Sequence, residues 1–510
     1  MRNGKTTQSA IPGRRFVLVL GVIAIAIAFL CSLGEHHFVT TDSCAYLSNA
    51  LNLNHGLGYT TDVARWDSAS DHQLIPFWPP VLPLCVAALN RLGIPVEESG
   101  LLVSAIFFGL LVGATGLTAG RITGRRGTAV FAAMSCLVFW PIFAQSIIVM
   151  TEMPFTAFSM VALYCCLRAA EGGHSRWFIW AALFVAATTM TRYIGVAEWA
   201  VFAGWCVWLV WRGVAPRSAL AWPVLAALPL AVWLVRNHLI YGGLTGHTVP
   251  PSIGLGHNLL EAIRFCVADF LPIPHLNTGL GLYAKYALAA VAVAVAFVLG
   301  LVCRRASNRV IWTGSAKGTV LVAVYAVAYL GTLAALAAVR DFDPINTRLT
   351  MPAYPAIIIV LAIAVVSLAE IAKVAKCIMI ALASAWLVLA TAASLRGAIY
   401  YTSGPWTSGR IRTEPSATLL RQMNAPRMAS DHPARVWYIT RRPARYLPDP
   451  ADKPEMNSIL EKHGLILVLF KDLDWRSPTI AGEAALRSAG ILPHLELVSD
   501  KPDCDVYRVP

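Results

Sequence analysis

Charged residues are scarce in this chain. Of its 510 residues only 14% are Asp, Glu, Lys or Arg, whereas a soluble protein carries roughly 25%. Hydrophobic residues make up 57% of the chain, and the mean hydropathy is +0.61. The polypeptide is therefore expected to lie mostly in a lipid bilayer, where long apolar segments are stable.

Several chemical signatures are also missing. The 11 cysteines include no C-x-x-C pair, and the 12 histidines include no His-x-x-x-His pair on a predicted helix, so we expect no metal and no cofactor. The net charge of +13 is spread over short segments between apolar runs, and no DNA- or RNA-binding motif accompanies it. Nucleic acid is therefore excluded as the expected partner.

Long apolar runs are what the chain has in abundance. A run of about 20 apolar residues spans a bilayer, and the sequence predicts about eleven such spans. The first follows a basic N-terminal segment, exceeds the apolar core of a signal peptide and precedes no A-x-A site, so we interpret it as a retained transmembrane helix. The expected spans are 16–34, 101–119, 128–147, 155–170, 177–191, 195–211, 219–235, 280–302, 318–338, 351–369 and 377–394.

Basic residues alternate between the two sides of these spans. One set of short connections holds clusters such as Arg121, Arg125 and Arg126, whereas the longer opposite connections hold only scattered Lys and Arg. Cytoplasmic loops carry the excess of positive charge. The sequence therefore predicts a multi-pass protein of the plasma (inner) membrane, with a cytoplasmic N-terminus and an extracytoplasmic C-terminus.

Three outer segments are too long to be turns, and such loops are usually functional. They are residues 35–100, 237–279 (with an amphipathic helix expected at 259–270) and the region from about 400. We expect a membrane domain over 1–400 and a small α/β domain over 401–510. In the latter, 434–440 and 465–470 are predicted strands, 454–463 and 480–489 helices, and 494–500 with 504–510 an antiparallel pair. No catalytic constellation is recognised there.

Asp42 stands in the run TTDSCAYL, just beyond the first span. Thr41 or Asp42 suits the N-cap of a helix predicted from Ser43 to Asn52. A carboxylate at the membrane surface also suits a base that takes a proton from a hydroxyl group, and the helix N-terminus would keep it ionised. The two interpretations are compatible, and both stay open.

Glu152 lies in the run VMTEMPF, between the third and fourth predicted spans. A carboxylate at bilayer depth is costly and usually faces a protein cavity, although an acid before Pro154 also suits the first turn of a helix. Arg192, Arg236 and Arg348 each end a span on the outer side. Their guanidinium groups suit a phosphate, or simply extend to lipid headgroups.

Six short motifs occur along the membrane region in a fixed order: the Asp42 loop, Trp78-Pro79-Pro80, Thr151-Glu152-Met153-Pro154, Thr191-Arg192-Tyr193, Arg236-Asn237 and Asn346-Thr347-Arg348-Leu349. Together they resemble the GT-C glycosyltransferases, polytopic enzymes that take a sugar from a polyprenyl-phosphate carrier. The protein mannosyltransferases, lipid A aminoarabinose transferases and core galacturonosyltransferases are the most similar members. The Glu-Lys-Pro-Pro motif of the aminoarabinose transferases is replaced by Phe77-Trp78-Pro79-Pro80, which argues against their substrate. Many relatives have Asp-Glu where this chain has Asp42-Ser43.

The resemblance implies a mainly α fold of GT-C type and inverting transfer of a sugar to a lipid, glycan or protein acceptor. It implies Asp42 as the base, Glu152 as a second catalytic acid, and Arg192, Arg348 and Arg236 as ligands of the donor phosphate. Further residues expected to line the substrate site are Tyr46, Asp71, His72 and Tyr193. A transporter or flippase is the alternative, although we find no internal repeat, and an inactive scaffolding relative is a third possibility.

Overall fold

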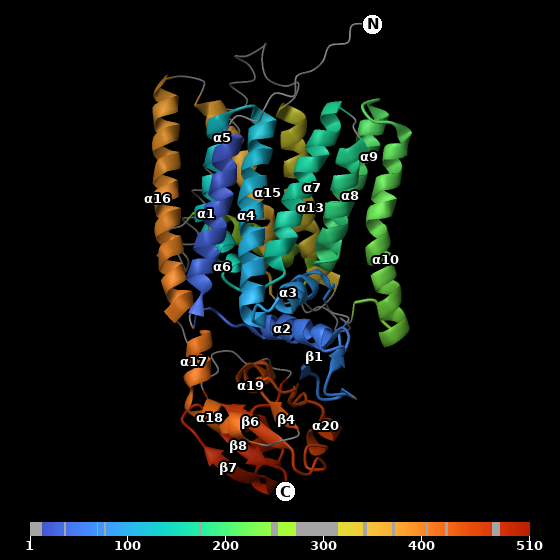
Figure 1. Cartoon of the computed structure of the whole chain (residues 1–510), viewed down its shortest axis with the longest axis vertical. Helices are drawn as coiled ribbons and strands as arrows, with labels where there is room; N and C mark the ends of the chain where they lie inside the picture. Colours follow the sequence, from blue (N-terminus) through green and yellow to red (C-terminus); the bar gives the residue numbers. More distant parts are fainter. Residues whose placement is uncertain are drawn as a thin grey trace.

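The computed structural model shows a bundle of long helices with a smaller lobe of short helices and strands at one end (Figure 1). We call residues 406–510 the C-terminal lobe. The bundle helices are α1 (Arg14–Ser32), α4 (Val96–Thr123), α5 (Arg126–Val138), α6 (Trp140–Ser146), α7 (Glu152–Gly172), α8 (Ser175–Thr189), α9 (Val196–Trp211), α10 (Ala221–Tyr241), α13 (Ser315–Val339), α15 (Tyr354–Leu368) and α16 (Lys373–Ser403). The structure describes residues 13–34, 37–68, 70–75, 78–172, 175–245, 253–271, 315–339, 344–369, 373–403, 406–423, 427–471 and 480–510.

Within these described residues, 8 helices are long and apolar enough to cross a membrane, or 9 if α5 and α6 form one span broken by a 62° bend. Helix α8, with 15 residues, is shorter, and the expected span 280–302 lies outside the described residues. The count of eleven therefore stays a prediction. The polytopic helical bundle itself is confirmed.

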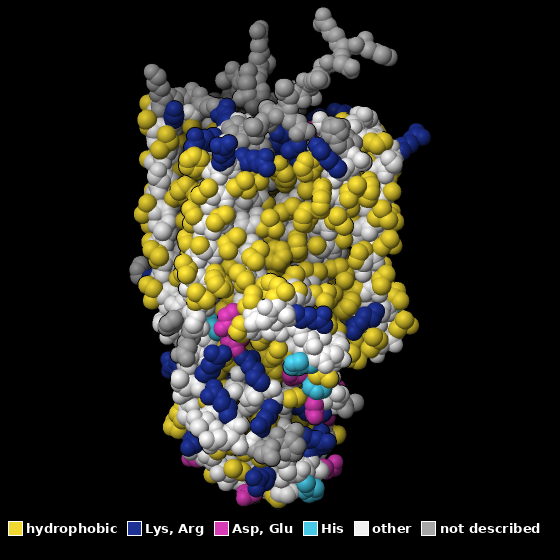
Figure 2. Space-filling model, in the orientation of Figure 1, with side chains coloured by type: hydrophobic (Ala, Val, Ile, Leu, Met, Phe, Trp, Pro, Cys, Tyr) yellow, Lys and Arg dark blue, Asp and Glu magenta, His cyan; other side chains and the backbone are white. Residues whose placement is uncertain are grey.

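Hydrophobic and basic side chains form separate bands on the surface. Figure 2 shows a wide hydrophobic belt around the bundle and a band of Lys and Arg at the end away from the C-terminal lobe. Helices such as α10 and α16 expose many large apolar side chains in this belt, among them Val232, Leu239, Val388 and Leu395. This is the pattern of a surface that contacts lipid along the belt and water at both ends.

Three helices lie outside the bundle proper: α2 (Thr41–Asn54), α3 (Val81–Arg91) and α11 (Leu255–Phe270). Helices α2 and α3 cross the end of the bundle that faces the C-terminal lobe (Figure 1). Helix α3 follows the double proline, and its Val81 N–H donates to the Met190 carbonyl at the end of α8 (3.2 Å). The helices predicted at Ser43–Asn52 and 259–270 are thus observed as α2 and α11, and their position at a membrane surface stays a prediction.

The C-terminal lobe is built on a six-stranded sheet in the order β2-β5-β4-β6-β8-β7. Strands β2 (Val63–Ala64), β5 (Ala444–Tyr446), β4 (Met428–Ser430) and β6 (Ile466–Phe470) are parallel, and β8 (Cys504–Arg508) and β7 (Glu496–Asp500) are antiparallel to their neighbours. Strand β2 comes from the first outer loop, where β1 (Thr60–Thr61) also pairs with β3 (Gln73–Leu74). The loop therefore contributes an edge to the sheet of the lobe.

One predicted strand is wrong. Residues 434–440 form helix α19 (Pro433–Thr440), not a strand. Pro433 occupies the first turn, and the His432 ring accepts from the Arg435 N–H (3.2 Å), which is the chemistry of a helix start. An apolar run buried on all sides has no period that separates helix from strand. The strand at 466–470 and the closing antiparallel pair are confirmed.

The remaining helices of the lobe are short. They are α17 (Ser408–Thr413), α18 (Pro415–Gln422), α20 (Lys453–Asn457) and α21 (Glu483–Ser488). Helix α20 begins one residue before the predicted helix 454–463, and α21 begins inside the predicted helix 480–489. Both observed helices end before the predicted ones. The predicted division after residue 400 falls inside the last turn of α16.

Candidate active site

The first turn of α2 brings Asp42 to the junction of the bundle and the lobe. Thr40, not Thr41 or Asp42, is the N-cap: its extended backbone (φ −112°, ψ 164°) directs its hydroxyl to the Ser43 N–H (3.0 Å). The prediction of a cap at Thr41 or Asp42 is therefore wrong, because the helix starts earlier than expected. With the cap supplied by Thr40, the Asp42 carboxylate is available for other contacts.

Asp42 forms an ion pair with Arg348. Nη1 of Arg348 donates to Oδ2 of Asp42 at 2.8 Å, and the two side chains are 26% and 30% exposed. Residues 306 positions apart in the chain thus meet at the end of the bundle that faces the C-terminal lobe, and solvent reaches both of them. Arg348 is therefore the charge partner of the Asp42 carboxylate.

Glu152, the first residue of α7, lies behind this pair and is 1% exposed. Its Oε1 forms an ion pair with Arg192 and lies 3.5 Å from Nε of Arg348. Asp42, Arg348, Glu152 and Arg192 therefore form a chain of alternating charge, which we call the acid–arginine chain. It runs from the solvent-exposed Asp42 inward to the buried Glu152.

Two hydroxyl groups extend this arrangement. Nη1 of Arg192 donates to the Thr151 hydroxyl (3.2 Å), which in turn lies 3.4 Å from the Tyr46 hydroxyl. Tyr46 follows Asp42 by one turn of α2, so both residues face the same side of that helix. The structure thus brings Tyr46 together with the acid–arginine chain, and its expected role in lining the substrate site stays a prediction.

A close approach of two backbones places Arg192. The turn η2 (Tyr193–Gly195) folds back on the end of α8, where a Cβ atom on Gly195 would lie 2.8 Å from Cα of Thr189. Only glycine fits this turn without a shift of the backbone. Arg192 stands just before it in extended conformation (φ −148°), and its guanidinium reaches Glu152.

Arg348 is held by a network that sequence reasoning missed. It lies in the short helix α14 (Thr347–Thr350), whose N-cap Asn346 accepts from the Leu349 N–H (3.2 Å). Asp269, near the end of α11, accepts from the Thr347 hydroxyl (3.2 Å) and from the Tyr354 hydroxyl (2.5 Å). The one available signal was an acid at the C-terminal end of a predicted helix, where the dipole disfavours it.

Arg236 and Tyr193 have a different set of partners. The Arg236 guanidinium lies 4.5 Å from the ring centre of Trp233 and donates to Asn237 Oδ1 (2.9 Å). The Tyr193 hydroxyl accepts from Trp233 Nε1 (3.1 Å) and from Asn237 Nδ2 (2.9 Å). These residues form an aromatic group at the outer end of α10, next in sequence to Arg192.

Asp71 and His72 lie at the contact between the first loop and the C-terminal lobe. Asp71 accepts from Nη2 of Arg445 (2.8 Å), and Nδ1 of His72 lies 2.8 Å from Asp62. Asp62 also accepts from Asn52 (2.7 Å) and from Trp437 of the lobe (3.1 Å). Both residues thus meet structural partners in the loop and the lobe, and the substrate-lining role stays a prediction.

The part of the chain that the structure describes contains no group of three or more His, Cys, Asp or Glu side chains arranged to hold a metal ion. Asp42 and Glu152 each face arginine, so the charge that balances these carboxylates is a guanidinium.

Known proteins share a matching segment or the fold with this chain. Residues 78–241 match the family model of the dolichyl-phosphate-mannose-protein mannosyltransferases. No curated protein matches the sequence. Among solved structures, ArnT from Cupriavidus metallidurans bound to undecaprenyl phosphate superposes with a TM-score of 0.61 at 13% identity, covering 97% of this chain and 98% of that one.

Two further structures are similar. The Archaeoglobus fulgidus oligosaccharyltransferase gives a TM-score of 0.53 at 12% identity, covering 90% of this chain and 69% of that one. The arabinofuranosyltransferase AftD from Mycobacteria, in its R1389S mutant form, gives 0.53 at 16% identity, covering 97% of this chain and 41% of that one. At these identities the similarity establishes the fold. The chain therefore has the fold of the GT-C glycosyltransferases, the superfamily that its motifs resemble.

Proposed function

We propose that the protein is a membrane glycosyltransferase that moves a sugar from a polyprenyl-phosphate carrier to an acceptor hydroxyl, with inversion at the anomeric carbon. The acid–arginine chain is the observation that carries this proposal. Two carboxylates and two guanidinium groups from separate segments of the sequence meet at one end of a bundle with the GT-C fold. In this reaction a carboxylate can accept the proton of the acceptor hydroxyl, and guanidinium groups can bind the departing phosphate.

Asp42 is the base in this proposal. The acceptor oxygen attacks the anomeric carbon, the bond from that carbon to the phosphate oxygen breaks, and polyprenyl phosphate departs with the electron pair. The acceptor proton passes to Asp42, which is ionised and 30% exposed. The phosphate leaves without being protonated, so no general acid is required.

Arg348 and Arg192 stabilise the departing phosphate. Arg348 donates to Asp42 (2.8 Å), and a donor phosphate would replace the carboxylate as its partner. This exchange would release Asp42 at the moment when the acceptor needs a base. Buried Glu152 then fixes both guanidinium groups by charge, so that they need little reorganisation during the reaction.

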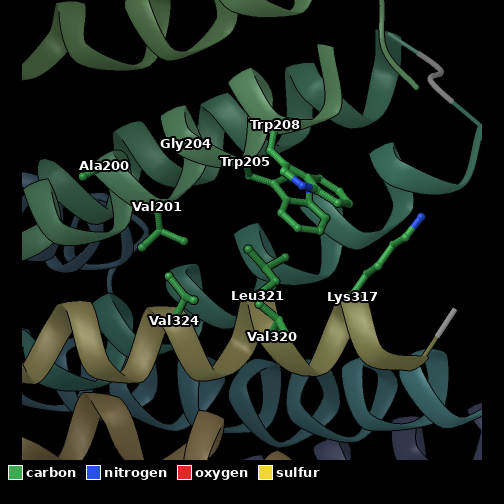
Figure 3. A pocket seen from close by; sticks show the side chains of 9 residues that line it. All are labelled: Ala200, Val201, Gly204, Trp205, Trp208, Lys317, Val320, Leu321 and Val324. Atoms are coloured by element: carbon green, nitrogen blue, oxygen red, sulfur yellow. The ribbon is translucent and has the colours of Figure 1, made fainter. Parts of the chain in front are cut away.

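A groove between α9 and α13 suits the apolar chain of such a donor. It encloses about 530 Å³ and is lined by apolar side chains of both helices, among them Val201, Trp205 and Leu321. Figure 3 shows these side chains facing one another across the groove, with Lys317 at one end. Helix α9 begins four residues after Arg192, so a chain in the groove would lead toward the proposed phosphate site. The ArnT structure is described as bound to undecaprenyl phosphate, a lipid of this class.

The charge bands support the proposed side of the membrane. Lys and Arg gather at the bundle end away from the lobe (Figure 2), which favours a cytoplasmic location for that end. The acid–arginine chain and the lobe would then be extracytoplasmic, in the plasma (inner) membrane. A reporter fused after Pro510 should therefore be active outside the cytoplasm, and activity only inside would contradict this orientation.

Two observations favour an enzyme over a transporter or flippase. The four charged groups of the chain gather at one end of the bundle, where an alternating-access carrier would place its substrate site near the middle of the membrane. Asp42 is also 30% exposed and does not cap its helix, so its carboxylate is accessible to an acceptor hydroxyl. A measurement of sugar transfer distinguishes an active enzyme from an inactive scaffolding relative.

The test is transfer of a labelled sugar from polyprenyl phosphate in membranes that contain the protein. Asp42→Asn should lower turnover by about 10²–10⁴, because the proton acceptor is lost. Insertion and binding of polyprenyl phosphate should change little, since Asn has nearly the same size. Thr40→Ala is the matched control: it removes the cap of the same helix, at a cost of about 1 kcal/mol in stability, and leaves Asp42 in place.

The two variants separate catalysis from folding. If Asp42→Asn retains more than about a tenth of wild-type turnover, Asp42 is not the base, and Glu152 becomes the first candidate. If Thr40→Ala is as inactive as Asp42→Asn, the loss reflects the position of α2 and not a missing base. Wild-type membranes that transfer no sugar from any polyprenyl-phosphate donor would contradict the proposed activity.

A further inference from the structure

Four arginines gather on the face of the C-terminal lobe that lies next to the bundle. They come from α17 and α18 and from the turn after α19, and we call them the arginine face: Arg412, Arg421, Arg441 and Arg442. Figure 2 shows dark blue side chains grouped on this part of the lobe. A cluster of like charges is often an ordinary solvated surface. The hydrogen bonds and ion pairs of the four side chains distinguish a binding surface from such a cluster.

Backbone carbonyls hold two of these guanidinium groups. Nε of Arg421 donates to the Ile439 carbonyl (3.2 Å) and its Nη2 to the Arg412 carbonyl (3.3 Å), and Arg442 donates to the Met423 carbonyl. These contacts fix the side chains without neutralising them. Among the described residues, no carboxylate forms an ion pair with Arg421 or Arg442.

The backbone at Arg441 is unusual. It is the one non-glycine residue with positive φ (57°) among those that the structure describes, and its N–H closes the end of α19 on the Trp437 carbonyl (2.7 Å). Its guanidinium lies 4.6 Å from the ring centre of Trp437 and 4.8 Å from that of Tyr438. Residues held in sparsely populated backbone conformations cluster at binding sites.

One carboxylate serves two members of the face. Buried Glu97 pairs with Arg441 and with Nη2 of Arg412 (2.6 Å), yet the two arginine side chains remain 34% and 36% exposed. The face therefore presents four fixed or partly fixed guanidinium groups against a single acid. This surplus of charge is what a phosphate or carboxylate group binds, often with two parallel hydrogen bonds to one guanidinium.

The arginine face lies close to Asp42. His37 is 3.1 Å from Glu97, and its carbonyl accepts from the Ser408 N–H (3.0 Å) at the start of α17. Asp42 follows His37 by five residues, so the two Cα atoms are at most roughly 18 Å apart. A single molecule extending from the proposed active site toward the lobe would reach the face.

We infer that the acceptor is an anionic molecule, and that the arginine face binds its phosphate or carboxylate groups while Asp42 receives the proton of its hydroxyl. This inference rests on the proposed function. The donor phosphate already has partners within the bundle, Arg348 and Arg192, whereas the face belongs to the lobe outside it. The face therefore suits the other substrate.

The first test is binding and does not need turnover. The full-length protein in detergent should bind tripolyphosphate, and Arg421→Gln with Arg442→Gln should weaken that binding by about 10- to 100-fold. The control is Arg487→Gln with Arg508→Gln, which removes the same charge from arginines paired with Glu483 and Glu496 elsewhere on the lobe. Equal affinities for both double variants would overturn the inference.

The second test uses the charge of the product. Labelled product formed by wild-type membranes should be retained on an anion exchanger at neutral pH, and the Arg421/Arg442 double variant should form it about 10-fold more slowly while binding polyprenyl phosphate normally. A neutral product, or normal transfer by a variant that has lost tripolyphosphate binding, would overturn the inference and leave the proposed function standing. Absence of any product would count against the proposed function. The binding test would still show whether the arginine face binds anions.

Discussion

Two buried carboxylates in this molecule are each held by two arginines, and they differ in what surrounds them. Glu152 contacts Arg192 and Arg348 within the lobe-facing end of the bundle, and Glu97 contacts Arg412 and Arg441 of the C-terminal lobe. Both residues begin or nearly begin a long helix, at α7 and α4. By composition alone the two clusters look equivalent.

Their remaining partners separate them. Glu97 also accepts from the Tyr438 hydroxyl (2.6 Å) and lies 3.1 Å from His37, so its partners close around it. Glu152 shares Arg348 with Asp42, and that second acid is 30% exposed. A closed cluster ties elements together, whereas a cluster that ends in an exposed acid can exchange a partner for a substrate. The comparison therefore assigns proton transfer and phosphate contacts to the acid–arginine chain, and to Glu97 the placement of two residues of the arginine face, Arg412 and Arg441.

The largest effect is expected from Arg348→Ala. It should lower turnover by about 10²–10⁴ and also weaken binding of polyprenyl phosphate, because the phosphate is a partner in both the ground state and the transition state. Turnover and lipid binding are measured on the same purified protein. Arg348→Lys keeps the charge but loses the fork of donors, and it should recover part of the binding. Normal lipid binding by Arg348→Ala would remove Arg348 from the donor site.

The second prediction concerns Glu97→Gln, which should unfold more readily without losing chemistry. Loss of a hydrogen bond to a charged group costs about 1.5–3 kcal/mol, and Arg412 and Arg441 would lose their common carboxylate while remaining partly exposed. We expect a lower melting temperature, with turnover per folded molecule within about 3-fold of wild type.

Glu98→Gln is the matched control for Glu97→Gln, because the neighbouring acid is partly exposed and should change stability by less than about 0.5 kcal/mol. If folded Glu97→Gln protein had turnover as low as Asp42→Asn, the claim that Glu97 takes no part in the chemical step would be contradicted.

Much of the fold and of the site could be predicted from the sequence. Apolar runs of membrane length and the order of short motifs identified the helical bundle, and Asp42, Glu152, Arg192 and Arg348 do meet. Each was recognisable because a charge at the end of an apolar span is costly and therefore informative. Tyr46 follows from the same logic, one helical turn from Asp42.

Other features depend on contacts between distant segments. Nothing local in Val63 and Ala64 indicates that they form an edge of the lobe's sheet, because a two-residue strand is defined by its partner β5. Asp269 and Glu97 stand within helices in the sequence, and their partners lie 60 to 344 positions away. The helix at 434–440 was hidden by its burial on every side.

A smaller effect is expected at Asp269, which acts on Arg348 through Thr347 and Tyr354. Asp269→Asn and Tyr354→Phe each disturb one end of the 2.5 Å hydrogen bond between these side chains. A hydrogen bond to a charged group contributes about 1.5–3 kcal/mol, and part of that loss should appear as about 10-fold weaker binding of polyprenyl phosphate. Because Asp269 positions Arg348, Arg348→Ala should make a further Asp269→Asn change nearly silent. Additive losses in the double variant would show that Asp269 acts independently.

The smallest effect concerns pH and the closed cluster at Glu97. Burial, with Arg412 and Arg441 nearby, lowers the pKa of His37 to about 4, from an ordinary value of 6.5. As the pH falls from about 6.5 to about 4, the unfolded chain takes up a proton at this ring that the folded protein does not. The contribution of neutral His37 to the free energy of unfolding is therefore fully present above pH 6.5. Between pH 6.5 and pH 4 it declines by about 1.4 kcal/mol per pH unit. The wild-type melting temperature should fall between pH 7 and pH 5, and His37→Gln should show a shallower decline. Parallel curves for the two proteins would mean that His37 is protonated in the folded state and that the Glu97 cluster is less closed than its contacts indicate.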